Sequence, residues 1–193
     1  NPTAIFDYTK GTPDYKYIDM KEIWYGIFDF GDYANKQPVP ERVYYFEDNV
    51  EKANLKIITT GHNWSSGTND AFNTGNAAEF YEATHNININ DELVYTQHLW
   101  RDCEPNPAGC QPQNGTWAYD RSGWCPGSIA MVWDYSLNDY ISDGNVNLFY
   151  QFDPTYLDLC HPNHPDCVDG ATCVYCSAAD NPVLRVSGKV VSY

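Results

Sequence analysis

The sequence predicts an all-β protein built as an antiparallel sandwich. Short segments rich in β-branched and aromatic residues recur at roughly 8–12 residue intervals, and Gly-, Pro- and Asn-rich turns separate them. No segment keeps the period of an amphipathic helix, and no internal repeat is evident. With 193 residues, the chain can hold one large β domain or two small ones, and it can bury a sizeable core.

The strands are expected where apolar residues alternate with polar ones or cluster between turns. Asn86-Ile-Asn-Ile-Asn90 is the clearest case, because its alternation predicts one wet face and one buried face. Between the strands we expect loops at residues 26–41 and 61–75, the second on the surface, and a short helical turn at 77–83. The expected strands cover residues 3–9, 15–25, 42–47, 53–60, 86–90, 94–100, 128–137, 146–152 and 182–193.

Charge and cysteine content limit the possible partners and compartment. The formal net charge of −15 disfavours nucleic acid and anionic membrane surfaces as partners. No run of 18 apolar residues is present, so no transmembrane helix is expected. Seven cysteines indicate disulfides in an exported, secreted or periplasmic protein, with one thiol left free or joined to another chain. Asn63-Trp-Ser65 and Asn114-Gly-Thr116 match the N-glycosylation pattern of a glycoprotein.

The stretch from Asn114 to Gly127 has the composition of a binding loop. Arg121 offers a planar fork of donors that suits a carboxylate or a polar ligand oxygen. Trp117 and Trp124 can form a flat apolar floor beside it that stacks on a sugar ring. The alternative is a disulfide-anchored loop, in which the tryptophans belong to the core and Arg121 is a structural ion-pair partner.

Three stretches together resemble one protein family. They are Gly11-Thr-Pro-Asp-Tyr-Lys-Tyr17, Gly75-Asn-Ala-Ala-Glu-Phe-Tyr-Glu-Ala-Thr-His85 and Tyr119-Asp-Arg-Ser-Gly-Trp-Cys-Pro-Gly127. They resemble the second domain of the peptide-N-glycosidase F family, amidases that remove N-linked glycans from glycoproteins. The resemblance runs from about Ile5 to Phe152.

The resemblance implies a particular domain organisation. It refines the fold to an eight-stranded jelly roll, an architecture shared with the paired jelly rolls of peptidylglycine-type copper monooxygenases. Residues 1–10 would be the last strand of an upstream jelly-roll domain that this chain lacks. Residues 11–193 would be the second jelly roll, with a Cys-rich insert at about 153–179.

The same resemblance implies an active site that needs no metal or cofactor. Glu79 and Arg121 match catalytic residues of the family and would hold the first sugar, the amide or a water. His62 and Trp124 match residues that line the sugar side of the cleft, and Phe80 replaces a third. The general base would come from the upstream domain, because the family's cleft lies between two domains. Cys103 and Cys125 match a family disulfide.

The chain departs from the family pattern near this site. Thr60 stands where the family has a tryptophan, and Phe80 replaces another tryptophan without its indole N–H. Ala77 and Tyr81 stand where the family has a disulfide that flanks the glutamate. These losses favour a second hypothesis, a non-catalytic extracellular module that binds glycan or builds an exported assembly.

Metal binding is a further alternative, at three places. Histidine and methionine side chains are ligands that suit copper. A series of carboxylate and amide side chains suits Ca²⁺, and the alternative for that series is a solvated turn. The insert cysteines suit disulfides or, with nearby histidines, zinc. The copper candidates are His62, His85, His98 and Met131; the calcium candidates are Asp139, Asp143, Asn145 and Asn147; the insert holds Cys160, His161, His164, Cys167, Cys173 and Cys176. Cys110 has no match in the family pattern.

Overall fold

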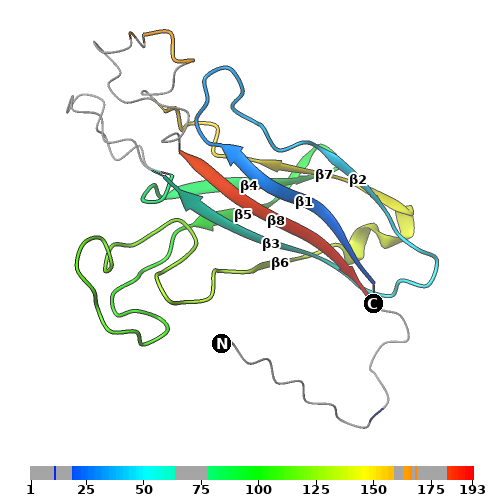
Figure 1. Ribbon diagram of the computed structural model, residues 1–193. Coiled ribbons are helices and arrows are strands. Elements are labelled where there is room, and N and C mark those ends of the chain that lie inside the picture. The colour runs from blue at the N-terminus through cyan, green and yellow to red at the C-terminus, as the bar shows by residue number, and fades with distance from the viewer. Residues whose placement is uncertain (1–10, 12–18, 64–77, 159–162, 167, 169–181) are drawn as a thin grey trace.

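The protein is a sandwich of two four-stranded antiparallel sheets, seen in a computed structural model (Figure 1). The structure describes residue 11 and residues 19–63, 78–158, 163–166, 168 and 182–193. One sheet has the strand order β1-β8-β3-β6, and the other has the order β2-β7-β4-β5. The expectation of an all-β antiparallel sandwich with eight strands is therefore confirmed.

Each sheet is centred on strands that are distant in the sequence. The first sheet contains β1 (Asp19–Asp29), β8 (Val183–Ser192), β3 (Ala53–His62) and β6 (Trp133–Ser136). The second contains β2 (Arg42–Tyr45), β7 (Asn145–Gln151), β4 (Ala83–Ile89) and β5 (Glu92–Leu99). β8 pairs with β1 on one side and with β3 on the other, along its full length.

The core lies between the two sheets, because alternate residues of the central strands point inward. In β3 every second residue, from Ala53 to Gly61, is buried. In β4 the residues at Ala83, His85, Ile87 and Ile89 are buried while the intervening ones are not, as the Asn/Ile alternation predicts. Trp24 is fully enclosed, and its indole N–H donates to the Pro40 carbonyl at 2.8 Å.

The expected strands differ most from the structure at the end of β1 and at the start of β6. β1 continues to Asp29, four residues past the expected end, because Ile27 and Phe28 pair with Arg185 and Leu184 of β8. β6 covers only Trp133–Ser136, since the expected segment 128–137 begins as a turn and only its second half pairs with β3.

The helical content is a single 3₁₀ turn, η1 (Asn138–Asp143), within the described ranges. Residues 78–80 form the turn expected before β4. The expected strand at 3–9, most of the loop at 61–75 and the cysteines at 160, 167, 173 and 176 lie outside the described residues. No helix in the described part of the chain has the length and apolar character needed to cross a membrane.

Candidate functional site

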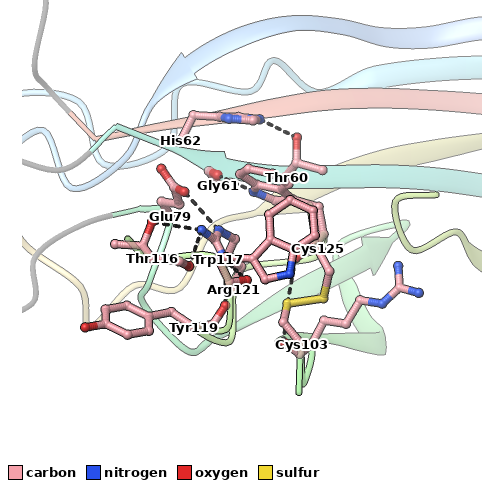
Figure 2. A network of polar contacts seen from close by, with 12 residues as sticks. Thr60, Gly61, His62, Glu79, Cys103, Thr116, Trp117, Tyr119, Arg121 and Cys125 are labelled. Atoms are coloured by element: carbon pink, nitrogen blue, oxygen red, sulfur yellow. Dashed lines mark hydrogen bonds and ion pairs between the residues drawn. A yellow bond between two sulfur atoms is a disulfide. The ribbon is translucent and has the colours of Figure 1, made fainter. Parts of the chain in front are cut away.

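Three segments meet at the carboxyl end of β3 (Figure 2). Ser122 connects them through hydrogen bonds. The Ser122 carbonyl accepts from Gly61 N at 3.0 Å, and Ser122 N donates to the Glu79 carbonyl at 3.0 Å. The Ser122 hydroxyl donates to the Tyr81 carbonyl at 2.6 Å. The end of β3, the turn before β4 and the loop at residues 114–127 are therefore held as one unit.

Two glycines permit this close approach of backbones. A Cβ at Gly61 would lie 1.8 Å from the Ala78 carbonyl oxygen, so a side chain there would push the turn away from β3. Gly123 has a φ of +81° and would place a Cβ 2.3 Å from the Thr59 carbonyl oxygen. Only glycine satisfies both conditions at position 123.

The guanidinium of Arg121 is buried and uses all five of its N–H donors inside the chain. Nε donates to Glu79 Oε1 at 3.0 Å. One terminal nitrogen donates to the carbonyls of Tyr119 at 2.6 Å and Trp117 at 3.4 Å. The other donates to the carbonyl of Thr116 at 2.6 Å and to its hydroxyl at 3.1 Å. Arg121 therefore organises its own loop and orients Glu79, and it keeps no donor for a ligand.

Glu79 is the more accessible partner of this ion pair. Its side chain is 18% exposed, against 3% for Arg121. Oε1 accepts from Arg121, whereas Oε2 accepts no hydrogen bond from the described residues and is not sealed from solvent. The arrangement presents one fixed carboxylate oxygen as an acceptor for a ligand hydroxyl or N–H group.

Aromatic rings form the walls around the ion pair. The centre of the guanidinium lies 5.0 Å from the Trp124 ring centroid and 5.1 Å from that of Phe80. His62 stacks on Trp124 with centroids 5.5 Å apart and an interplanar angle of 25°. Trp124 is fixed by a 2.9 Å hydrogen bond from its indole N–H to the Gly61 carbonyl. The exposed Tyr119 packs edge-on against Phe80.

His62 is kept neutral near physiological pH. Burial lowers its pKa below the ordinary value, and the positive charge of Arg185 lowers it further. Its Nε2 lies 2.8 Å from the Thr60 hydroxyl. Thr60 thus holds the ring of His62.

Trp117 does not form a floor with Trp124, contrary to the sequence-based expectation. Its side chain lies by the Cys103–Cys125 disulfide and lines a separate cavity of about 400 Å³ with Pro105 and Cys110. The floor beside Arg121 is made by Trp124 and Phe80 instead. Trp117 contributes to the ion pair only through its carbonyl.

The disulfide and an adjacent backbone bridge anchor the loop that carries Arg121. Cys103 and Cys125 are joined, which is the pairing that the family resemblance implied. Arg101 and Arg121 exchange backbone hydrogen bonds at 2.9 and 3.1 Å. Among the described cysteines, Cys110 is a free thiol.

The histidines considered for copper lie apart. His85 points into the core, whereas His98 is exposed on the neighbouring strand and pairs with Glu82 at 2.7 Å. His62 belongs to the other sheet. Within the described ranges, no three His, Cys, Asp or Glu side chains form a group that would hold a metal ion.

Two contributors to the site were not predicted from the sequence. Ser122 and Thr116 act through short polar contacts to backbone or to Arg121, and neither residue type stands out in a loop. Their only signal is their position beside Arg121 in a stretch dense in glycine and tryptophan.

Comparison with known proteins places the chain in a family. A family description of "Peptide-N-glycosidase F, C terminal" matches residues 32–163. The chain is also 30% identical over 152 residues to peptide-N(4)-(N-acetyl-β-D-glucosaminyl)asparagine amidase F of Elizabethkingia miricola. The chain belongs to the peptide-N-glycosidase F family, within its C-terminal domain.

Solved structures agree on the fold. A crystal structure of a peptide-N(4)-(N-acetyl-β-D-glucosaminyl)asparagine amidase matches 95% of this chain with a TM-score of 0.69 and 23% identity. A glycosylasparaginase from Flavobacterium meningosepticum matches 95% of the chain with a TM-score of 0.65. The chain spans 42% of the length of the Elizabethkingia relative and 54% of each of these two structures, so about half of its relatives' length.

Proposed function

We propose that this chain supplies the sugar-binding side of an amidase that releases N-linked glycans from glycoproteins. The free oxygen of Glu79 carries this proposal, because it is a partly exposed acceptor fixed by Arg121. It would accept a hydrogen bond from a hydroxyl or acetamide N–H of the first sugar. The relative's activity toward N-acetylglucosaminyl-asparagine agrees with such a ligand.

The aromatic rings and the neutral His62 suit the rest of the sugar. Trp124 and Phe80 offer apolar faces, and His62 leaves Nδ1 without a partner among the described residues. Arg121 is a positioning residue in this proposal, since all its donors are used within the chain. The proposed reaction is a hydrolysis and transfers no electrons, so it needs no redox cofactor, and the proposal includes no metal ion.

The reaction requires a general base that takes a proton from the attacking water, and in this proposal the base lies outside this group of residues. Water adds to the side-chain amide carbon of the glycosylated Asn, the C–N bond breaks, and the nitrogen leaves on the sugar with a proton. The product on the polypeptide is Asp. We propose that an upstream jelly-roll domain supplies the base, with residues 1–10 as its last strand and residues 11–193 as the second domain. The disulfide supports an exported protein.

A second candidate is a glycan-binding module without catalysis. The complete internal use of the Arg121 donors favours it, as does Thr60 in place of the family's tryptophan. In that case Glu79 would bind the sugar without taking part in a reaction.

Mass spectrometry of a glycopeptide distinguishes the two candidates. The full-length protein from the source organism is incubated with an N-glycopeptide, and the conversion of Asn to Asp is followed. We expect conversion, with a loss of about 100-fold or more in Glu79→Gln but little change in Glu82→Gln, whose carboxylate faces solvent beside His98. Binding without conversion supports the module, and unchanged conversion in Glu79→Gln rejects the role of Glu79.

A further inference from the structure

The cavity beside the disulfide has the features of a second binding site. Its volume of about 400 Å³ lies within the usual range of ligand pockets. One half-buried indole ring, that of Trp117, forms part of its wall. The other apolar wall residues are Pro105, Cys110, Pro112 and Ala118.

The walls of this cavity are held by contacts within the loop. The Asn106 side chain donates to the Pro126 carbonyl at 2.9 Å, and its Oδ1 accepts from Ala108 N at 3.0 Å. Cys103, which also lines the cavity, is joined to Cys125. The Asn106 amide group therefore serves the loop, and the cavity is part of a fixed structure.

Glu104 gives the cavity a negative charge. It is the single charged residue among those that line the cavity. It is exposed, and its carboxylate has no hydrogen-bond or ion-pair partner among the described residues. The segment from Asp102 to Asp120 contains no lysine or arginine, and the whole chain has a formal net charge of −15. The carboxylate is therefore available to a cation, and the field of the protein attracts one.

These groups together suit a lysine or arginine side chain. The face of an indole ring attracts a cation through its quadrupole. Apolar walls such as those of Pro105 and Pro112 can cover the aliphatic stem of a long basic side chain. The Glu104 carboxylate can pair with the charged group. A neutral sugar has many hydroxyl groups to satisfy and would find few free polar side chains here, so it is a poorer match.

We propose that this cavity binds a lysine or arginine side chain of the polypeptide that carries the glycan. The identity of that polypeptide rests on the proposed function. Trp117 connects the two places, because its carbonyl accepts from Arg121 whereas its ring lines the cavity. A glycopeptide whose sugar lies at Glu79 can therefore place a nearby basic side chain in the cavity.

A peptide titration followed by NMR tests the cavity in the full-length protein. The probes are acetyl-Ala-Lys-Ala-amide and its norleucine counterpart, which keeps the four-carbon stem and lacks the ammonium group. We expect the lysine peptide to shift the indole N–H signal of Trp117 in a saturable way, with a Kd at least about fivefold lower than that of the norleucine peptide. The indole signal of Trp124, which donates to the Gly61 carbonyl at the candidate site, should stay in place.

Two results of this titration would overturn the proposal. One is the absence of a saturable shift at Trp117 with the lysine peptide. The other is an equal affinity for the lysine and norleucine peptides, which would mean that the cavity does not recognise the positive charge.

A pair of charge-removing variants tests Glu104. Glu104→Gln should weaken binding of the lysine peptide about threefold or more. Glu92→Gln is the matched control, because it removes the same charge from an exposed position on β5, and it should leave the affinity nearly unchanged. Unchanged affinity in Glu104→Gln, or an equal loss in both variants, would reject the role of Glu104 and with it the cation site.

The peptides carry no glycan, so the amidase and the cation site fail separately. Binding of the lysine peptide by a protein that converts no glycopeptide would reject the amidase and keep a pocket for a basic side chain. Conversion of a glycopeptide by a protein that does not bind the lysine peptide would reject the pocket and keep the amidase.

Glycopeptide kinetics test whether the substrate polypeptide is the occupant. In a series in which one lysine is moved along the glycopeptide, at least one member should have a KM about threefold or more below that of its norleucine counterpart. Equal KM values throughout the series would overturn the assignment of the cavity to the substrate.

Discussion

The protein contains two buried polar clusters that differ in access. In the core cluster, the Tyr150 hydroxyl bonds to Gln97 and lies 2.9 Å from the Thr59 hydroxyl, while His85 packs nearby; all four residues are fully buried. In the site cluster, Arg121 is equally buried, but Glu79 and His62 are partly exposed.

The comparison shows that burial of polar groups does not by itself define a functional site. Both histidines have a lowered pKa, and desolvation is the main cause in each. His85 accepts a hydrogen bond from Asp153 N at 2.9 Å among aromatic rings, so it serves the core. His62 lies at a sheet end and stacks on Trp124, whose ring also packs against the guanidinium that holds Glu79. The two histidines therefore differ in solvent access: His85 is sealed in the core, whereas His62 is partly exposed at the candidate site.

The largest effect is expected at Arg121, which should be a stability residue as well as part of the site. Arg121→Met leaves the Glu79 carboxylate and three loop carbonyls without their donor, so we expect a loss of about 3–5 kcal/mol in the free energy of unfolding. Urea denaturation measures it. Arg101→Met is the control, since among the described residues its guanidinium donates only to the Ile129 carbonyl. A similar loss there would show that the site cluster has no special role.

The core cluster should respond more weakly to loss of a single hydroxyl. Tyr150→Phe removes the partner of Gln97 and Thr59 and should cost about 1–3 kcal/mol, because two buried polar groups lose a hydrogen bond. Glycopeptide binding should stay unchanged, since the cluster is sealed. A change in binding without a change in stability would contradict the division between the clusters.

Acid should destabilise the protein partly through His85. Burial lowers its pKa from 6.5 to about 3 in the folded protein, with Asp153 opposing this shift and Tyr150 packed beside the ring. The unfolded chain therefore binds a proton below pH 6.5 that the folded chain does not. Stability should fall as the pH drops from about 6.5 toward 3, by about 1.4 kcal/mol per pH unit from this group.

His85→Gln should reduce that slope, which urea denaturation at pH 7, 6 and 5 would measure. The matched control is His98→Gln, which changes an exposed histidine on the adjacent strand and should leave the slope nearly as it is. Equal slopes in the parent protein and in His85→Gln would mean that His85 binds a proton as readily in the folded chain as in the unfolded chain, which would contradict the lowered pKa.

The smallest effect is expected for an ion pair outside both clusters. Lys56→Gln removes the partner of Asp134 on the exposed sheet surface and should cost at most about 1 kcal/mol. Thermal unfolding at low and high salt measures it. A loss comparable to that of Arg121→Met would show that access does not govern the strength of these pairs.

The sequence predicted most of the fold because alternation is a local signal. β3 and β8 follow apolar periodicity, and both appear within two residues of their expected bounds. The end of β1 was missed because Gly26 and Asp29 resemble loop residues, while pairing with β8 keeps them in the sheet.

The site was less predictable, because its contacts are made by backbone atoms. The family resemblance placed both Glu79 and Arg121 in the candidate site. No sequence pattern could show that the carbonyls of Thr116, Trp117 and Tyr119 accept hydrogen bonds from the Arg121 guanidinium. The direction of the Trp117 ring depends on how the loop folds over the disulfide, which composition does not specify.

The most direct test of the difference between the clusters is an NMR titration of the full protein with N,N′-diacetylchitobiose. The Nε–H of Arg121 is a buried donor to Glu79 and reports on that carboxylate, and the ring protons of His85 report on the core. We predict that the sugar shifts the Arg121 signal in a saturable way and leaves the His85 signals in place. Saturable binding that leaves the Arg121 signal unmoved would contradict the assignment of the site to Glu79 and Arg121.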